Sequence, residues 1–337
     1  MRSSRAAAFA LVLATLVSAG LASTAAARSN DVKLGLVGYA VPREALGAII
    51  TEWQKTPDGR GVDFTQSYGA SGDQARAVVN GLRADIVQLS TGLDVEVIVR
   101  AGLIDANWDK QSYKGIVSNS VVVFAVRPGN PKKIKKWEDL IKPGVEVITP
   151  NPFTSGAAKW NILAAYGSQK KQGKTEKQSV DFVRKLFKNV VVQARSGRDA
   201  TNAFLSGKGD VLLAYENEAL LSRRNGTDIQ FTIPKQTMLI ETPIAVLKDS
   251  EHKEQANQFL RFTRSVTAQR IWAEYGFRPV NEQVAKETRK KFPSRPTIYR
   301  ISDAIFGGSW AAADKKWFAP RGSIMVDIER DIGGPTT

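Results

Sequence analysis

The sequence predicts an α/β fold of two lobes, each built on a mixed, mostly parallel sheet that is flanked by helices, with a ligand cleft between the lobes. Three observations support this prediction. The chain has 337 residues, more than the roughly 100 to 200 residues of a single domain. Strand-like and helix-like segments alternate along it, which is typical of parallel sheets covered by helices. No Pro/Gly/Ser-rich linker divides the chain, so we expect extended strands to join the lobes.

The first 27 residues predict a cleavable secretory signal. Arg2 and Arg5 supply its positive start, residues 6–22 an apolar stretch, and residues 25–27 a small-residue cleavage site. The chain contains no cysteine, which excludes disulfides, thiolate metal sites and a lipid-modified cysteine after the signal. We therefore expect a free, monomeric protein in the periplasm, where two membranes retain it.

The charge of the chain is strongly positive, because 48 Lys and Arg residues stand against 33 Asp and Glu residues and give a net charge of +15. Such a field attracts anions of any kind. The basic residues are spread along the chain, and no aromatic side chains interleave their modest clusters to stack bases. Binding of nucleic acid is therefore not predicted.

The predicted elements follow a β-α-β rhythm. The first strand alternates apolar residues from Val32 to Leu36, and a helix covers 43–53. Further strands are predicted at 62–66, 85–89, 120–126, 146–149, 190–193, 210–215 and 243–247.

The runs 118–127 and 241–248 are the candidates for strands that cross between the lobes. With these crossings, residues 28–117 and 249–337 form one lobe and residues 118–248 form the other. Ligands of open α/β sheets bind outside the carboxyl ends of the strands. A cleft between the two lobes is therefore the expected site.

Three segments share one pattern, in which a short polar loop and a small or polar N-cap candidate precede an amphipathic helix. In YGASGDQARAVVNGL the N-cap candidate is Ser71. In NPFTSGAAKWNILAAYG the candidates are Thr154 and Ser155, and Gly167 is predicted to end the helix. In ARSGRDATNAFLSGKGD, residues 196–197 precede a helix whose predicted C-cap is residue 207.

The start of a helix can bind an anion, because its first N–H groups lack partners within the helix and carry a partial positive charge. Several such starts in one cleft would surround a tetrahedral dianion with uncharged donors. Small N-cap residues are also common in any α/β protein, so each segment alone has a purely structural interpretation. Their number favours an anion site.

These segments, and nearly the whole chain after the predicted signal, resemble the periplasmic sulfate- and thiosulfate-binding proteins of ABC importers. The resemblance is carried by VKLGLVGYAVPRE, GASGDQA, NGLRADIV, NPKKIKKWEDLIKPGVEVITPNPFTSGAAKWNILAAYG, GKGDVLLAYENEALL, YGFRPVNEQVA and FGGSWAAADKKWF. It implies a type II periplasmic-binding-protein fold and a dehydrated sulfate held by backbone amides, hydroxyls and an indole. It also implies delivery to the membrane permease subunits of an ABC transporter, with no cofactor, no metal and no catalytic residues.

The resemblance also implies the residues of the site. The positions that match ligand-binding positions of the family are Ser71, Ser155, Gly156, Ala157, Gly197 and Tyr215, with Thr154, Arg198 and Asp73 as possible supporting residues.

Four positions depart from the family pattern. Tyr215 stands in place of an indole donor, Gly197 lies in an altered loop, Ala40 replaces a frequent aspartate, and Asp73 replaces a frequent basic residue. Sulfate carries no proton near pH 7 and can only accept hydrogen bonds, whereas phosphate keeps a proton that needs an acceptor. We therefore expect Asp73 to turn outward and cap its helix.

Two alternatives remain open on the sequence. The first is another oxyanion on the same fold, such as phosphate or molybdate, because fold does not determine the ligand. The second is a secreted hydrolase. Its candidate groups would be the single histidine, His252, and the neighbouring Glu216 and Glu218, which are more typical of a solvated surface and of helix-start charges.

Overall fold

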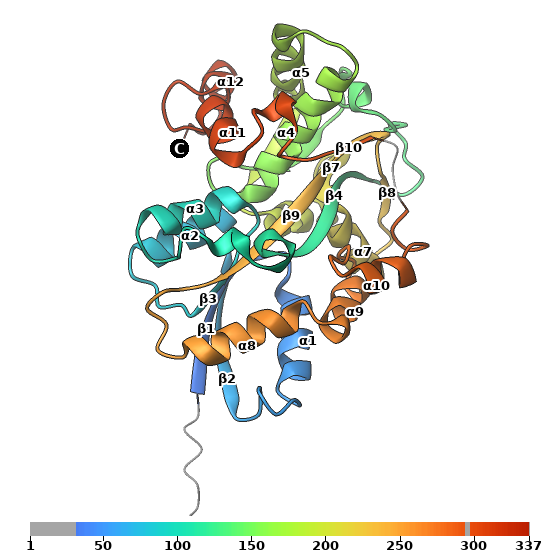
Figure 1. The fold of residues 1–337 in the computed structure, drawn as a ribbon. Coiled ribbons are helices and arrows are strands. Elements are labelled where there is room, and N and C mark those ends of the chain that lie inside the picture. Colours follow the sequence, from blue (N-terminus) through green and yellow to red (C-terminus); the bar gives the residue numbers. More distant parts are fainter. Residues whose placement is uncertain (1–31, 294–296, 337) are drawn as a thin grey trace, which may run out of the picture. The chain divides into compact units, whose positions relative to one another are not determined.

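The computed structural model describes residues 32–293 and 297–336 (Figure 1). The secretory signal predicted for residues 1–27 lies outside the described residues. Within the described ranges, no helix combines the length and the apolar character that a membrane crossing requires.

The described strands belong to one mixed sheet. They are β1 (Val32–Tyr39), β2 (Val62–Gly69), β3 (Ile86–Gln88), β4 (Ile116–Val126), β5 (Val147–Pro150), β6 (Val190–Ala194), β7 (Val211–Tyr215), β8 (Gln230–Thr232), β9 (Gln236–Val246) and β10 (Thr297–Tyr299).

The helices lie mostly between these strands, as the alternation predicts. They are α1 (Arg43–Trp53), α2 (Ser71–Val79), α3 (Gly92–Arg100), α4 (Gly156–Lys171), α5 (Glu176–Lys188), α6 (Gly197–Leu205), α7 (Glu216–Arg224), α8 (Lys253–Thr263), α9 (Val266–Glu274), α10 (Glu282–Glu287), α11 (Trp310–Trp317) and α12 (Ile324–Ile332). Short 3₁₀ turns cover Trp108–Lys110, Ser112–Gly115, Trp137–Ile141 and Ala304–Phe306.

The strand order is β2-β1-β3-β9-β4-β7-β5-β6, and it contains two parallel sets. In the first set β1 pairs in parallel with β2 and β3, and in the second set β5 pairs in parallel with β6 and β7. The long strands β4 and β9 run antiparallel between the sets (Figure 1). Beyond their shared stretch, β9 pairs with β3 and β4 pairs with β7.

Strand β9 is longer than the sequence predicts, because it begins at Gln236 instead of residue 243. The first residues of β9 show no regular alternation of apolar and polar side chains, because buried threonines interrupt the apolar residues. The hydroxyl of Thr237 donates to the carbonyl of Val122 at 2.6 Å, and Thr242 pairs with Ser118 at 2.8 Å. These hydrogen bonds satisfy the buried hydroxyls and allow polar residues inside a central strand.

Helix α4 does not end at Gly167, and that prediction is wrong. The helix continues to Lys171, and Gly167 lies buried in its middle. A Cβ atom at this position would lie 2.8 Å from the ring of Tyr299 and 2.9 Å from the ring of Phe306. The glycine therefore serves close packing of the helix against the C-terminal segment, which a local pattern cannot reveal.

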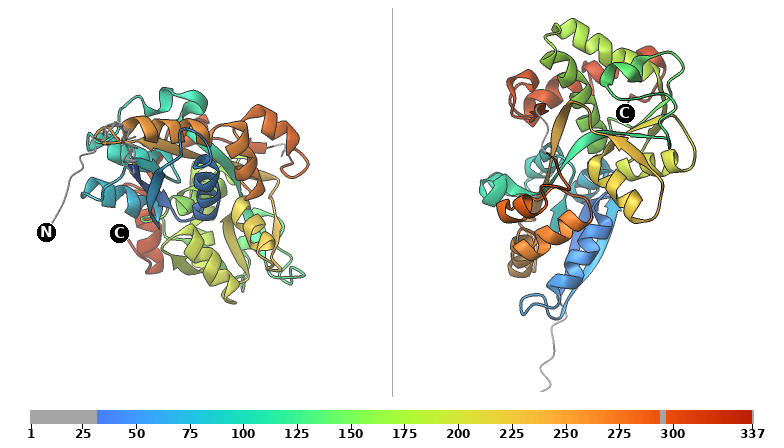
Figure 2. Two further views of the ribbon diagram at one scale, coloured as in Figure 1. Left: turned by 90° about the horizontal axis from the view of Figure 1, so that it is seen from below. Right: turned by 90° about the vertical axis from the view of Figure 1, so that its right-hand side faces the viewer.

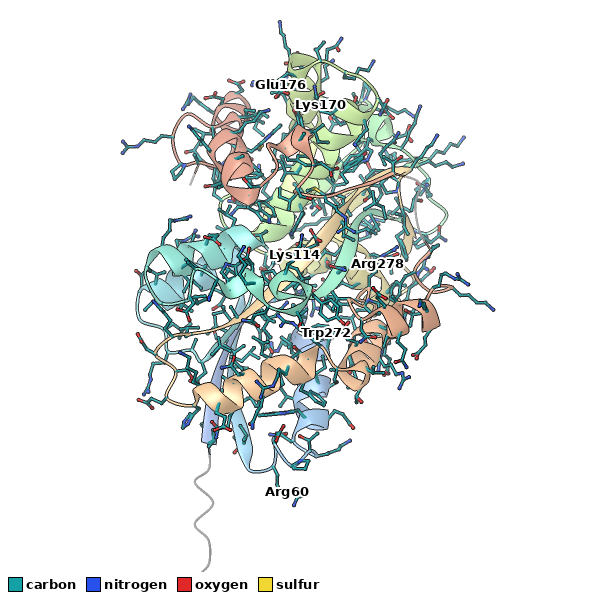
Figure 3. The ribbon with its side chains drawn as sticks, in the orientation of Figure 1. Arg60, Lys114, Lys170, Glu176, Trp272 and Arg278 are labelled. Carbon is teal, nitrogen blue, oxygen red and sulfur yellow. The ribbon has the colours of Figure 1, made fainter. Side chains whose placement is uncertain are left out.

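The C-terminal segment contacts the central strand β9 and helices next to each of the two parallel strand sets. Strand β10 pairs with the start of β9, helix α12 packs beside α5, and α11 packs against α3. Figure 1 labels these elements, and Figure 2 shows the same ribbon from two further sides. Glu176 at the start of α5, labelled in Figure 3, forms an ion pair with Lys316 of α11 at 2.6 Å. Residues 297–336 therefore attach to the protein over a wide surface.

Glu329 of α12 is fully buried. We therefore expect the stability of the folded protein to depend on pH. Its Oε2 accepts a hydrogen bond from Gln193 at 2.9 Å, whereas its Oε1 has no partner among the described residues. Burial raises the pKa of Glu329 from its usual 4.5 to about 7, and the bond from Gln193 opposes this rise. The folded protein therefore binds more protons than the unfolded chain between these pH values, and its stability falls as pH rises through this window.

The substitution Glu329→Gln is expected to raise the free energy of unfolding at pH 8 by about 2 kcal/mol, because the buried charge disappears. At pH 4 the two proteins are expected to be equally stable. Urea unfolding at both pH values tests this expectation, and a variant that is less stable than the unaltered protein at pH 8 would contradict it.

Candidate anion-binding site

The predicted helix starts meet at one small cavity, which lies where the carboxyl ends of both parallel strand sets face each other. Its volume is about 10 Å³, near the lower limit for a single enclosed water molecule. The lining residues are Tyr39, Ala40, Val41, Gly69, Ala70, Ser71, Ser90, Ser155, Gly156, Ala157, Ser196 and Gly197. Five of the six predicted ligand-binding residues are among them, and Tyr215 is not.

Free backbone donors line this cavity. Ser71, Gly156 and Gly197 are the first residues of α2, α4 and α6, and their N–H groups have no acceptor within the described ranges. The dipoles of the three helices add partial positive charge at the same place. In the part of the chain that the structure describes, no charged side chain lines the cavity. These properties favour an anion held by uncharged groups.

The Ser71 side chain plays a structural role that the sequence does not predict. The N-cap of α2 is Ala70, and Ser71 is the first helical residue. Its hydroxyl donates to Asp94 Oδ2 at 2.6 Å and accepts from the N–H of Ser90 at 2.9 Å. Since this hydroxyl is already committed, Ser71 can offer the cavity only its backbone N–H.

Ser155 and Thr154 serve different purposes at the start of α4. Ser155 is the N-cap, and its Oγ accepts from the N–H of Ala157 at 3.2 Å, so its own hydrogen remains available to the cavity. Thr154 stands outside the cavity lining. Its carbonyl accepts from Gly72 N–H at 3.0 Å, and its hydroxyl donates to the carbonyl of Arg195 at 2.8 Å. Thr154 thus joins the starts of α2 and α4, as a supporting residue would.

Ser90 is a cavity residue that sequence reasoning missed. Its hydroxyl lies 2.6 Å from the hydroxyl of Tyr215, and its carbonyl accepts from Trp160 Nε1 at 2.9 Å. It follows β3 and precedes Thr91, the N-cap of α3. The segment LSTGLD therefore repeats the pattern of a polar loop before a helix, and this signal could have identified it.

The sequence matches the family model of bacterial extracellular solute-binding proteins over residues 34–278. The chain belongs to this family. The solute-binding protein is 42% identical to a sulfate-binding protein of Synechocystis over 91% of this chain and 89% of the relative. It is 33% identical to a thiosulfate-binding protein of Pseudomonas aeruginosa over 93% and 96% of the two chains. These matches confirm the resemblance drawn from the sequence.

A solved structure extends the comparison to the fold. The solute-binding protein shares 44% identity and a TM-score of 0.81 with the sulfate-binding protein SubI from Mycobacterium tuberculosis, over 84% of this chain and 98% of that one. The predicted type II periplasmic-binding-protein fold is therefore confirmed.

Asp73 of the solute-binding protein turns away from the cavity, as expected. It does not cap α2, because its carboxylate pairs with Arg76 in the same helix and with Arg195 Nε at 2.5 Å. The two arginines account for its orientation. Ala40 lines the cavity, but its N–H donates to the carbonyl of Gly69 at 2.9 Å and is not free.

Arg198 connects three elements beside the cavity. It pairs with Glu44 of α1 at 2.6 Å and with Glu218 of α7 at 2.9 Å, and it donates to the carbonyl of Val41 at 3.1 Å. Burial by itself disfavours the charge of Arg198, but the carboxylates of Glu218 and Glu44 raise its pKa above the usual value. Arg198 therefore stays charged and acts by holding α1, α6 and α7 together.

The groups considered for a hydrolase do not form a catalytic cluster. Glu218 pairs with Arg198, and Glu216 pairs with Arg278 Nε at 2.6 Å, a residue labelled in Figure 3. His252 is half-buried at the start of α8 and does not line the cavity. The solute-binding protein thus uses both carboxylates to position arginines.

Proposed function

We propose that this protein binds sulfate or thiosulfate in the periplasm and delivers it to the membrane permease subunits of an ABC transporter. One observation carries the proposal: within residues 32–293 and 297–336, three helix-start N–H groups without a partner meet at a cavity that no charged side chain lines. The names of its relatives, which are sulfate- and thiosulfate-binding proteins, support the choice of ligand.

The chemistry of the lining groups suits an anion that only accepts hydrogen bonds. Backbone N–H groups of α2, α4 and α6 and the hydroxyl of Ser155 can all donate. The carboxylate of Asp94, which contacts the lining residue Ser71, accepts from Ser71 and Thr91 and pairs with Lys159 at 3.4 Å. Among the described residues no carboxylate lines the cavity, so an oxyanion that carries a proton would find none there to receive it. Each charge-assisted hydrogen bond contributes roughly 1.5–3 kcal/mol.

Closure around the ligand is part of the proposal. The predicted lobes, residues 28–117 with 249–337 and residues 118–248, would be hinged at β4 and β9. Several contacts join residues assigned to different lobes, among them Gly72 with Thr154, Ser90 with Trp160, and Arg198 with Glu44. An open form would admit the anion, and the closed form would be stabilised by donors from both sides and be recognised by the permease.

Titration calorimetry on the protein without its signal tests the ligand. We expect sulfate to bind with a Kd of about 1 µM or lower, equivalent to about −8 kcal/mol. The affinity should be nearly constant between pH 6 and 8, because sulfate has no proton to lose and the described residues place no carboxylate or histidine in the cavity lining. Tight binding of phosphate or molybdate with none of sulfate would overturn the ligand assignment.

We also infer that the protein works as a monomer without metal, cofactor or catalytic turnover. The relatives are named for binding and not for a reaction. Incubation of the purified protein with aryl sulfate esters should release no sulfate, and turnover in that assay would contradict a pure binding function.

A further inference from the structure

Two hydroxyl groups form a pair at one wall of the cavity, and only one of them faces the ligand space. We propose that Tyr215 orients the hydroxyl of Ser90 so that Ser90 always donates to the bound oxyanion, which makes the pair a determinant of specificity for oxyanions without a proton. This inference rests on the proposed function and deepens it.

In this structure the side chain of Tyr215 lies outside the lining of the cavity. Its side chain is buried with 2% exposure and does not line the cavity. Burial raises the pKa of Tyr215 well above its usual value, so the phenol keeps its proton. Within the described ranges, the only hydrogen-bond partner of this hydroxyl is Ser90 Oγ, at 2.6 Å. If Ser90 donated instead, the buried phenolic proton would have no acceptor among the described residues, so we assign that proton to the hydrogen bond with Ser90.

Ser90 is held in place on three sides. Its N–H donates to Ser71 Oγ at 2.9 Å, and its carbonyl accepts from Trp160 Nε1 at 2.9 Å. The third constraint is Gly156, where a Cβ atom would lie only 2.6 Å from Ser90 Oγ. The absence of a side chain at position 156 thus leaves the space that the Ser90 hydroxyl occupies.

The direction of the Ser90 hydrogen follows from these contacts. A hydroxyl has one hydrogen to donate and lone pairs to accept. When Ser90 Oγ accepts the phenolic proton of Tyr215, its own hydrogen must point elsewhere, and the cavity is the open side. The pair then presents a donor to the ligand. Polarisation along two linked hydroxyls strengthens that donor.

A fixed direction of the Ser90 hydrogen makes the cavity select sulfate over hydrogen phosphate. Sulfate offers only acceptors and matches a fixed donor, whereas hydrogen phosphate must place its proton against some acceptor. If Tyr215 lacked its hydroxyl, Ser90 could rotate and accept that proton. Loss of the phenol should therefore weaken discrimination more than it weakens sulfate binding.

The test measures sulfate and phosphate affinity by calorimetry for the full mature protein and three variants, Tyr215→Phe, Ser90→Ala and the double variant. Ser90→Ala should weaken sulfate binding by about 10- to 100-fold. Tyr215→Phe should lower the ratio of sulfate to phosphate affinity by about tenfold. In the Ser90→Ala background, Tyr215→Phe should change sulfate affinity by less than about twofold, because the phenol acts through Ser90.

A matched control removes another buried phenol. Tyr299 is fully buried and contacts Gly167 in the middle of α4, away from the residues that line the cavity, so Tyr299→Phe should leave both affinities unchanged. Circular dichroism and melting curves verify that each variant folds.

The possible results separate the two proposals. An unaltered selectivity in Tyr215→Phe, or equal effects of Tyr215→Phe with and without Ser90, would overturn the hydroxyl pair alone. Failure of the unaltered protein to bind sulfate would overturn the proposed function together with this inference.

Discussion

Replacement of Ser155 by aspartate is expected to abolish sulfate binding while the protein stays folded. Ser155 caps α4 and lines the cavity. Aspartate is as good an N-cap as serine, so the helix start should remain intact. Its carboxylate would nevertheless occupy the ligand space, accept from the free N–H groups and repel a dianion. Because like charges in close contact cost several kcal/mol, we expect Kd to rise by at least about 1000-fold in calorimetry.

Ser155→Asn is the matched control for this prediction, because asparagine has nearly the same size and also caps helices but carries no charge. It should bind sulfate at least about 100-fold more tightly than Ser155→Asp, and the difference isolates the effect of charge. Melting curves should show that Ser155→Asp is no less stable than the unaltered protein. Retained sulfate binding in the aspartate variant would place the ligand elsewhere.

Loss of Arg198 is expected to produce the second large effect. Arg198 lies between Glu44 and Glu218, and the Glu218 side chain is only 3% exposed. Arg198→Met keeps the apolar stem but leaves the Glu218 carboxylate buried without its arginine. Such a broken pair costs about 3–5 kcal/mol when both charges are buried. Because Glu44 is partly exposed, we expect the free energy of unfolding to fall by about 3 kcal/mol in urea titrations.

Arg195→Met supplies the control on a neighbouring arginine. Arg195 pairs with Asp73, but its side chain is 74% exposed. An exposed ion pair contributes little to stability, so this variant should unfold at nearly the same urea concentration as the unaltered protein. Equal losses in the two arginine variants would contradict a special role for the buried network around Arg198.

Much of the fold could be predicted from local patterns. The alternation of strands and helices places β1, β2, β5, β6 and β7 within a few residues of their observed bounds. The N-cap predictions for Ser155 and residue 196 are also correct. Such features depend on neighbours in the chain, because caps and periodic apolar faces are properties of short segments.

Other features of the site could not be predicted in this way. Ser71 resembles an N-cap in the sequence, but its side chain is drawn to Asp94, 23 positions later. Tyr215 matches a ligand-binding position, but it reaches Ser90, 125 positions earlier, instead of the cavity. Gly167 resembles a helix end, but it packs against Tyr299.

The sequence by itself determined the two-lobed α/β class and the segments at which helices expose free N–H groups, because both follow from the order of residues within short stretches. Only the tertiary structure decided which of these N–H groups share a cavity, which hydroxyls are already committed to a partner, and which carboxylates are paired with arginines. The physical reason is that a hydrogen bond or an ion pair depends on distance and direction in space. Residues far apart in the chain reach the required distance and direction only when the folded sheet brings the ends of its strands together.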